Sequence, residues 1–314
     1  MNRSNRPWGP LKSADLEWNS NSTPRSKRFS DVYFSSDDGL DKSKHLFLMG
    51  NSLLERWAVH PLPVFTVVET GFGSGLNFLQ TWAAWQQQPY PKPRLQYASI
   101  EKYPLTKNEL SRALIAWPTL RNCADQLIDN YPEPIPGQHR IVLEEGAVTL
   151  DLWWEDVTDA LPAIAANGMG CVDAWYLDGF DPAHNKSMWT QSLYDEMARA
   201  SRGDATFASS TRAAVVRRGL RRAGFQASTA LDTGGKRDCL RGHTTRKPPE
   251  FDSADTPWDI PSERALPPQS AVVLGAGLAG CTIAAALAQR GIKVTVLEEK
   301  ALASGGSGND QGIL

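Results

Sequence analysis

The sequence predicts an α/β protein built on a doubly wound sheet. Between residues 62 and 245, short apolar segments rich in β-branched and aromatic residues alternate with segments whose apolar residues recur at helical spacing. Two glycine-rich segments each follow an apolar run and precede a helical pattern. Strand, glycine turn and helix in this order are typical of Rossmann-like sheets. We therefore expect one such domain, preceded by a small β cap and followed by a second βαβ unit.

The expected elements follow in chain order. Residues 1–61 mix polar turns with short patterns such as DVYFS and HLFLMG, which favour a small N-terminal β cap. Residues 62–245 form the main domain, and residues 246–269, with six prolines and no periodicity, have the composition of a linker. Residues 270–314 form the second unit. The strands expected in the main domain are FTVVET, QYASIE, a hairpin across RIVLEEGAVTLDLWW, DAWYLDGF, TFASST, and a final antiparallel pair in FQASTA and DCLRGH.

The composition is that of an ordinary soluble protein, with 41% hydrophobic and 22% charged residues among 314. No apolar run approaches the ~18 residues of a membrane span, and the first residues lack the apolar core of a signal peptide. We therefore expect a cytoplasmic protein without a membrane partner. The four cysteines are far apart and the five histidines show no metal-binding pattern, so we expect reduced thiols and no metal site.

The segment VVETGFGSGLN carries the most informative pattern. Gly71, Gly73 and Gly75 stand at alternate positions between a strand and a helix, where glycine allows positive φ and a close approach of the backbone to a ligand. With Glu69 at the strand end and Asn77 at the helix start, they form a predicted cofactor-binding set. The spacing is neither that of a dinucleotide fingerprint nor that of a P-loop. It resembles the first motif of class I S-adenosylmethionine (SAM) methyltransferases; the alternative is a tight turn without a ligand.

Two further acids are placed to contact a nucleoside-like cofactor. Glu101 closes the apolar alternation of LQYASIE, about 30 residues after the glycines, where a carboxylate can accept hydrogen bonds from both ribose hydroxyls. Considered alone, Glu101 would be a solvated strand-end carboxylate. Asp156 can accept from an adenine amino group or serve as a helix N-cap. Asp151, in the preceding strand, is expected to be structural.

The segment DAWYLDGFDPAHN predicts a reactive loop directly after a buried strand. Such loops face the ligand in doubly wound folds. Methyl transfer to an amine requires the nitrogen to lose a proton and to lie about 3 Å from the methyl carbon. Asp178 can orient an amine and accept its proton, Phe180 can stack on a flat base, and Asp181 places a second carboxylate beside Asp178. The alternative is an ordinary Asp-Gly turn, and His184 is expected at the rim.

The stretch from Arg199 to Lys247 is strongly basic, with 12 Lys and Arg against 3 Asp and Glu. In AAVVRRGLRRAGF the spacing buries Val216, Leu220 and Ala223 and leaves four arginines on the other face of a helix. Such a face is either solvated or a phosphate-binding surface. Together with the following basic segment, the region Arg212–Lys247 makes RNA a candidate partner.

The C-terminal segment AVVLGAGLAGCTIAAALAQRGIKVTVLEEK carries a dinucleotide fingerprint. Gly275, Gly277 and Gly280 have the required spacing, and Glu298 follows Gly280 by 18 residues at the end of the next expected strand. We assign these four residues as binding a dinucleotide such as FAD in a complete domain. Because the chain stops 16 residues after Glu298, we expect only the beginning of such a domain here.

Over nearly its whole length the chain resembles the family of bifunctional tRNA 5-methylaminomethyl-2-thiouridine biosynthesis proteins. The resemblance rests on DVYFSSDDGL, ETGFGSGLNFL, EKYPLT, EEGAVTLDLWWED, DAWYLDGFDPAHN, VVRRGLRRAGF, GGKRD and SGNDQG. It implies an N-terminal SAM-dependent domain that methylates 5-aminomethyl-2-thiouridine at the tRNA wobble position, and a C-terminal FAD domain that first removes a carboxymethyl group. It implies cofactor roles for the first glycine motif and Glu101, a catalytic role for Asp178, and the anticodon stem-loop as partner of the basic region.

Departures from the family pattern leave some roles open. The family usually has Ala at the position of Asp181, so either Asp178 or Asp181 could be the base. We expect methyl transfer but neither FAD binding nor oxidative chemistry from these 314 residues. The alternatives are an amine methyltransferase acting on a small molecule or a protein, an oxidoreductase acting through the second fingerprint, and a catalytically dead tRNA-binding remnant.

Overall fold

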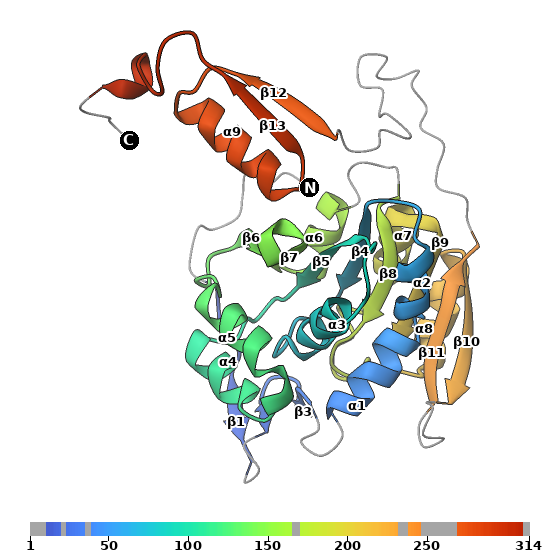
Figure 1. The fold of residues 1–314 in the computed structure, drawn as a ribbon. Helices are drawn as coiled ribbons and strands as arrows, with labels where there is room; N and C mark the ends of the chain where they lie inside the picture. Colours follow the sequence, from blue (N-terminus) through green and yellow to red (C-terminus); the bar gives the residue numbers. More distant parts are fainter. Residues whose placement is uncertain are drawn as a thin grey trace. The chain divides into compact units, whose positions relative to one another are not determined.

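The computed structural model describes residues 11–19, 23–34, 39–164, 170–231, 238–245 and 269–309. The chain divides into two compact units, one of residues 1–141 and 150–261 and the other of residues 142–149 and 262–314 (Figure 1). The linker expected at 246–269 lies outside the described residues except for its last position. No helix among the described residues is long and apolar enough to cross a membrane.

The central sheet has eight strands in the order β10-β11-β9-β8-β4-β5-β7-β6. β4 pairs in parallel with β5 on one side and with β8 on the other, so the order reverses at β4. The predicted hairpin supplies the neighbours β6 and β7, and the predicted final pair is antiparallel. The strands are β4 (Val64–Glu69), β5 (Arg94–Ile100), β6 (Gly137–Leu143), β7 (Val148–Trp154), β8 (Val172–Leu177), β9 (Ser201–Ser209), β10 (Phe225–Leu231) and β11 (Asp238–Thr244).

Helices cover both faces of this sheet, which confirms the doubly wound prediction. Successive side chains of a strand point to opposite faces. Tyr176 of β8 stacks on Phe47 on one face, whereas its neighbour Trp175 belongs to the buried cluster formed with three helices on the other face, those of residues 157–164, 191–200 and 214–222. The helices after β4 are α3 (Leu76–Gln86), α4 (Lys107–Leu114), α5 (Arg121–Asp129), α6 (Val157–Ile164), α7 (Gln191–Ala200) and α8 (Ala214–Arg222), with short turns η3 (Pro118–Leu120) and η4 (Glu144–Gly146).

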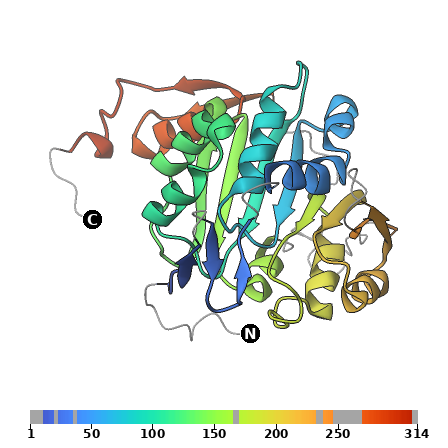
Figure 2. The ribbon, with the colours of Figure 1, turned by 90° about the horizontal axis from the view of Figure 1, so that it is seen from below.

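Three short strands near the N-terminus form the predicted β cap. β1 (Leu16–Trp18), β2 (Pro24–Ser26) and β3 (Asp31–Val32) pair in antiparallel fashion. This small sheet lies beside α4 and α5, as Figures 1 and 2 both show. The Arg112 guanidinium of α4 lies 4.1 Å from the ring centroid of Trp18, and the Ala14 amide donates to the Pro104 carbonyl at 3.1 Å. The cap is therefore attached near the end of β5.

The expectation of a strand in HLFLMG is wrong. This segment is the π-helical η2 (Lys44–Met49), between α1 (Gly39–Ser43) and α2 (Leu53–Val59). Leu46, Phe47 and Leu48 are all buried, because the helix covers the sheet face that presents Tyr176. A helix satisfies its backbone hydrogen bonds internally while it covers a sheet, whereas a strand would need a neighbouring strand.

The second unit contains the predicted βαβ arrangement. β12 (Ser270–Leu274) and β13 (Lys293–Leu297) pair in parallel and are connected by α9 (Leu278–Gln289); the turn η5 (Gly306–Gly308) follows. The lack of neighbouring strands predicts that Val272, Val273, Val294 and Val296 are all exposed. Val272 and Val296 are exposed, whereas Val273 and Val294 are partly buried.

Candidate cofactor and acceptor site

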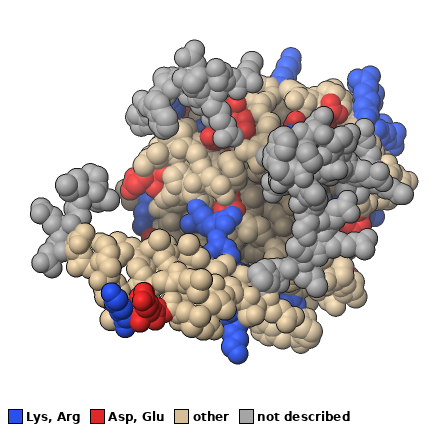
Figure 3. All heavy atoms as spheres, turned by 90° about the horizontal axis from the view of Figure 1, so that it is seen from above, with Lys and Arg blue, Asp and Glu red and all other residues tan. Residues whose placement is uncertain are grey.

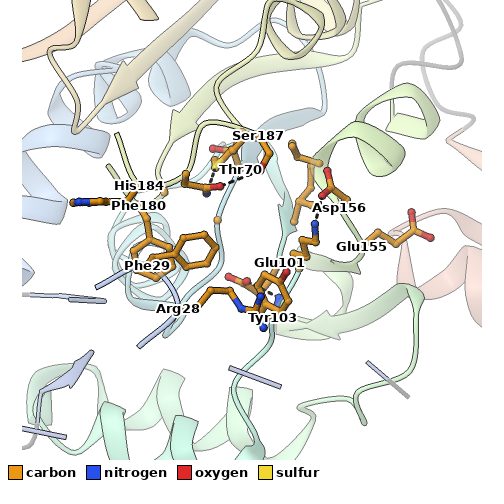
Figure 4. A pocket seen from close by; sticks show the side chains of 17 residues that line it. Arg28, Phe29, Thr70, Glu101, Tyr103, Glu155, Asp156, Phe180, His184 and Ser187 are labelled. Carbon is orange, nitrogen blue, oxygen red and sulfur yellow. Dashed lines mark hydrogen bonds and ion pairs between the residues drawn. The ribbon is translucent and has the colours of Figure 1, made fainter. Parts of the chain in front are cut away.

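A cavity of about 330 Å³ lies where β4, β5, β7 and β8 end (Figure 4). Because β4 and β8 meet at the point where strand order reverses, this is the position at which doubly wound sheets bind their ligands. The volume is at the lower end of the ~300–1,000 Å³ typical of small-molecule sites. Its wall comes from Arg28 and Phe29, Thr70 and Gly71, residues 100–103, residues 155–157, Gly179 and Phe180, His184 and Asn185, and Ser187 and Met188.

The first glycine loop lies against the loop that follows β8. A Cβ on Gly71 would lie 2.9 Å from the Asp178 carbonyl oxygen, and the Thr70 hydroxyl donates to that same oxygen at 2.8 Å. Gly75 has φ +72° and precedes the first residue of α3, and a side chain there would strain the backbone. The two loops can approach this closely only with glycine at position 71. Thr70 is a wall residue that the spacing argument did not identify.

Asn77 joins the fully buried carboxylate of Glu69 to the partly buried carboxylate of Asp178 behind the cavity wall. Its Nδ2 donates to Glu69 Oε1 and to Asp178 Oδ2, both at 2.7 Å, and its Oδ1 accepts from the Ser43 hydroxyl at 2.6 Å. Ser99 donates to Glu69 Oε2 at 2.8 Å. Glu69 and Asn77, predicted to bind the cofactor, are not among the residues that line the cavity. Asn77 holds Asp178, and Glu69 is held in turn by Asn77 and Ser99.

The two carboxylates have raised pKa values. Burial, and then the nearby charge of Asp178, raises the pKa of Glu69 to about 8. Burial likewise raises the pKa of Asp178, against hydrogen bonds from Asn77, Gly179 and Ser210 and the charge of Lys42. Because burial disfavours the charged form of both groups, this pair holds a proton at higher pH than a free carboxylate does.

Glu101 is at the end of β5 and lines the cavity, where the sequence places it. One carboxylate oxygen accepts from the amide of Gly73 at 3.0 Å and the other from the amide of Tyr103 at 2.9 Å. Burial raises the pKa of Glu101 although these amides oppose the shift. The contact with Gly73 connects the ends of β4 and β5, so Gly73 also serves the site from behind the wall.

Asp156 lines the cavity beside Lys102, whose Nζ donates to Asp156 Oδ2 at 2.7 Å. Its other oxygen accepts from the amide and the hydroxyl of Thr158 at 3.0 and 2.9 Å, so Asp156 is the N-cap of α6. Burial acts to raise the pKa of Asp156, but the contacts with Lys102 and Thr158 outweigh it and lower the pKa. Asp151 is structural as predicted, since Arg140 donates two hydrogen bonds to it.

The residues of the reactive loop separate in space. Phe180 lines the cavity, and Asp178 lies just behind it, held by Asn77. Asp181 is exposed and is not among the lining residues; its Oδ1 accepts from the Ala183 amide at 2.7 Å, which stabilises the loop's own turn. His184 lies at the rim, directed away from the centre of the cavity in Figure 4.

An aromatic cluster supplied by the N-terminal cap forms the wall that sequence reasoning missed. The ring of Phe29 stacks on Phe180 with centroids 4.6 Å apart and planes at 21°, and Tyr33 meets the Phe180 ring edge-on at 5.3 Å. The Arg28 guanidinium lies 4.4 Å from the ring centroid of Tyr103. Figure 4 shows the two phenylalanine rings side by side. The only sequence signal was the aromatic spacing in RFSDVYF, which a β cap explains equally well.

The predicted basic helix is α8. Val216, Leu220 and Ala223 are buried, as predicted. Arg221 donates two hydrogen bonds to the Ala227 carbonyl, so it also stabilises the start of β10. No carboxylate among the described residues forms an ion pair with Arg217, Arg218 or Arg222; Lys236, Arg237, Arg246 and Lys247 of the predicted basic region lie outside the described residues. On the face shown in Figure 3, basic and acidic side chains are interspersed.

The second fingerprint has the expected local geometry. Gly275 adopts φ +93°, and a Cβ on Gly280 would clash with the Gly275 carbonyl. The amide of Ala276 donates to Glu298 Oε2 at 2.7 Å, which places the acid beside the glycine turn. Gly277 precedes the first residue of α9. Among the described residues no group of three or more His, Cys, Asp or Glu side chains could hold a metal ion.

The fold and the glycine-lined site define a class, the SAM-dependent methyltransferases. A family profile described as S-adenosyl-L-methionine-dependent methyltransferase matches residues 118–245, and one described as FAD dependent oxidoreductase matches residues 270–314. A crystal structure of MNMC2 from Aquifex aeolicus has a similar fold, with a TM-score of 0.58 and 19% identity over 78% of this chain and 75% of that one.

Within that class the chain belongs to the family of the tRNA 5-methylaminomethyl-2-thiouridine biosynthesis bifunctional protein MnmC. It is 44% identical to the protein of Aeromonas hydrophila over 97% of its length, and 45% identical to that of Stutzerimonas stutzeri over 96%. The chain spans 46% and 45% of the lengths of these two relatives.

Proposed function

We propose that the chain methylates the amine of 5-aminomethyl-2-thiouridine at the wobble position of tRNA, with SAM as methyl donor. One observation carries the proposal: a single cavity at the ends of β4, β5 and β8 brings together Gly71, Glu101 and Phe180, with Asp178 directly behind its wall. The name of the MnmC homologues supports the choice of tRNA as the substrate. A tRNA substrate implies a cytoplasmic site of action.

The residues fit the cofactor. Gly71 lines the cavity, where a side chain would press on the Asp178 carbonyl, and Glu101 is an acceptor on the cavity wall for the ribose hydroxyls. Asp156, already the N-cap of α6, stands where an adenine amino group could also be bound. When bound, SAM supplies an electrophilic methyl group on a sulfonium centre.

The chain's own residues would then position and deprotonate the amine. Asp178 orients the amine and accepts its proton, since a carboxylate whose pKa is raised is a better base near neutral pH than an ordinary one. Phe180 stacks on the pyrimidine ring. A wobble base lies in a single-stranded loop, so it can enter a cavity at modest cost. Asp181 remains the alternative base.

The test is methyl transfer from labelled SAM to tRNA that carries 5-aminomethyl-2-thiouridine. Transfer to this tRNA but not to tRNA with the carboxymethylaminomethyl group is expected, because only the first presents a free primary amine. Asp178→Asn should lower kcat roughly 10²–10⁴-fold with SAM affinity retained, whereas Asp181→Asn should leave kcat near that of the unchanged protein. If Asp181→Asn lowered kcat more than Asp178→Asn does, Asp181 and not Asp178 would be the base. Absence of transfer to either tRNA while SAM binds would reject the substrate.

A further inference from the structure

The tip of the β2–β3 hairpin forms part of the cavity wall and lies against Phe180. Arg28 and Phe29 both line the cavity, although they belong to the N-terminal cap rather than to the sheet. The ring of Phe29 lies nearly parallel to that of Phe180, with centroids 4.6 Å apart. Two parallel rings that face one cavity are suited to a flat ligand.

The hairpin is held in this position from several sides. The Arg25 guanidinium donates to Glu17 at 2.8 Å and to the Ser30 carbonyl at 3.0 Å, and Ser30 adopts φ +53°, an uncommon conformation for a residue other than glycine. The amide of Asp181 donates to Asp31 at 3.3 Å, which connects the hairpin to the reactive loop. The tip is therefore a positioned part of the site.

Arg28 adds a positive charge at the cavity. Lys102, the other cation of the wall, is paired with Asp156, whereas no described carboxylate forms an ion pair with Arg28, whose guanidinium lies over the Tyr103 ring. Arg28 is exposed. An arginine held flat against an aromatic ring keeps its N–H groups free at the edge, where they can donate to a phosphate.

We propose that Phe29 and Arg28 bind the acceptor nucleotide: Phe29 stacks on the acceptor base from the side opposite Phe180, and Arg28 pairs with a phosphate of the same strand. At 4.6 Å the rings leave no space between them, so they separate to roughly 7 Å, twice the ~3.5 Å contact distance of carbon atoms, when the base enters. In the free protein Phe29 occupies the place of the base on Phe180. This inference rests on the proposed function.

The test compares two anticodon stem-loop RNAs, one with 5-aminomethyl-2-thiouridine and one abasic at the wobble position, by fluorescence anisotropy with and without SAM. Phe29→Ala should weaken binding of the base-bearing RNA about 5- to 150-fold and leave the abasic RNA unaffected, because the substitution removes only the stacking on the base. Phe29→Tyr should restore affinity. SAM affinity, measured separately, should not change.

Arg28→Ala should weaken the binding of both RNAs. It should also reduce the slope of log affinity against log salt concentration by about 0.7, the value for one phosphate bound on a single strand. Lys27→Ala is the matched control, since Lys27 is on the same hairpin but pairs with Asp15 and does not line the cavity. It should leave the slope unchanged.

If Phe29→Ala weakened the binding of both RNAs equally, Phe29 would have a merely structural role and the proposal would be overturned. Tighter binding of the base-bearing RNA by the Phe29→Ala protein would overturn it too, because Phe29 would then only compete with the base. The proposed function fails in a different way: the unchanged protein would bind both RNAs equally and transfer no methyl group.

Discussion

At the residue scale, the site depends on one amide that serves two carboxylates. Asn77 has two N–H donors, and they satisfy Glu69 and Asp178 at the same distance of 2.7 Å. The Ser43 hydroxyl determines which way this amide points, because it donates to the oxygen. Asn77 therefore positions the carboxylate of Asp178, the predicted base, and the proton held by the pair can be detected through its effect on stability.

Glu69→Gln should change how the stability of the protein depends on pH. The folded-state pKa of Glu69 is raised to about 8 from an ordinary value near 4.5. Between these values the folded chain retains a proton that the unfolded chain has lost, so the group's contribution makes the free energy of unfolding fall as pH rises, by up to about 1.4 kcal/mol per pH unit. Glu69→Gln should flatten this dependence in urea unfolding measured from about pH 5 to pH 8.

Glu55→Gln, at an exposed position of α2, is the control and should retain the slope of the unchanged protein. Parallel pH profiles for the unchanged protein and Glu69→Gln would show that Glu69 ionises normally in the folded chain.

At the element scale, α8 combines packing with charge. Its apolar residues are buried against the sheet, while Arg217, Arg218 and Arg222 have no ionic partner among the described residues. Arginines without ionic partners in successive helical turns present a dense positive charge that salt can screen. The helix also follows the end of β9, where Ser210 contacts Asp178 at 3.4 Å, so the charged surface begins near the reactive loop.

The triple variant with Gln in place of Arg217, Arg218 and Arg222 should bind tRNA more weakly. The slope of log affinity against log salt concentration should fall by about 0.7–0.9 for each phosphate that is no longer neutralised. SAM affinity and thermal stability should be retained, because these three arginines neither line the cavity nor belong to the buried core. The control is Arg121→Gln with Arg199→Gln, two arginines that are already paired with acids. An unchanged salt slope in the triple variant would exclude α8 from the RNA interface.

At the scale of the whole molecule, the two glycine motifs differ in how much structure surrounds them. The first is enclosed by an eight-stranded sheet with helices on both faces, whereas residues 269–309, around the second, have two strands, one helix and a short turn. Leu274, Leu278 and Leu297 are exposed there. A dinucleotide site spans two mononucleotide-binding halves, and the described unit supplies elements of one.

A preparation of these 314 residues should therefore show no flavin absorbance, and added FAD should not bind stoichiometrically. The glycine turn and Glu298 alone offer few groups that can bind the dinucleotide. The measurement is the visible spectrum of the purified protein before and after incubation with FAD and gel filtration. A yellow protein with one FAD per chain would refute the prediction.

Most of the fold was predictable because it follows local rules. The alternation of strands and helices, the hairpin of β6 and β7, and the final antiparallel pair each reflect periodicity that the chain shows within a few residues. The prediction for HLFLMG was wrong because an apolar hexapeptide fits either a strand or a helix. The sheet face that this segment covers, at Tyr176, is more than 120 residues away in the sequence. The positions of Gly71, Glu101 and Phe180 on the cavity wall were predictable because strand ends of a doubly wound sheet meet at one edge.

The doubly wound class, the two glycine turns and the acids at the strand ends could all be predicted, since they depend on residue type and short spacing. Tertiary structure alone decided which of these residues reach the cavity. Asn77 lies between Glu69 and Asp178, and the carboxylate of Asp181 accepts a hydrogen bond within its own turn. Phe29 stacks on Phe180, which is 151 residues further along the chain. Such contacts arise from packing between distant segments, which no local pattern records.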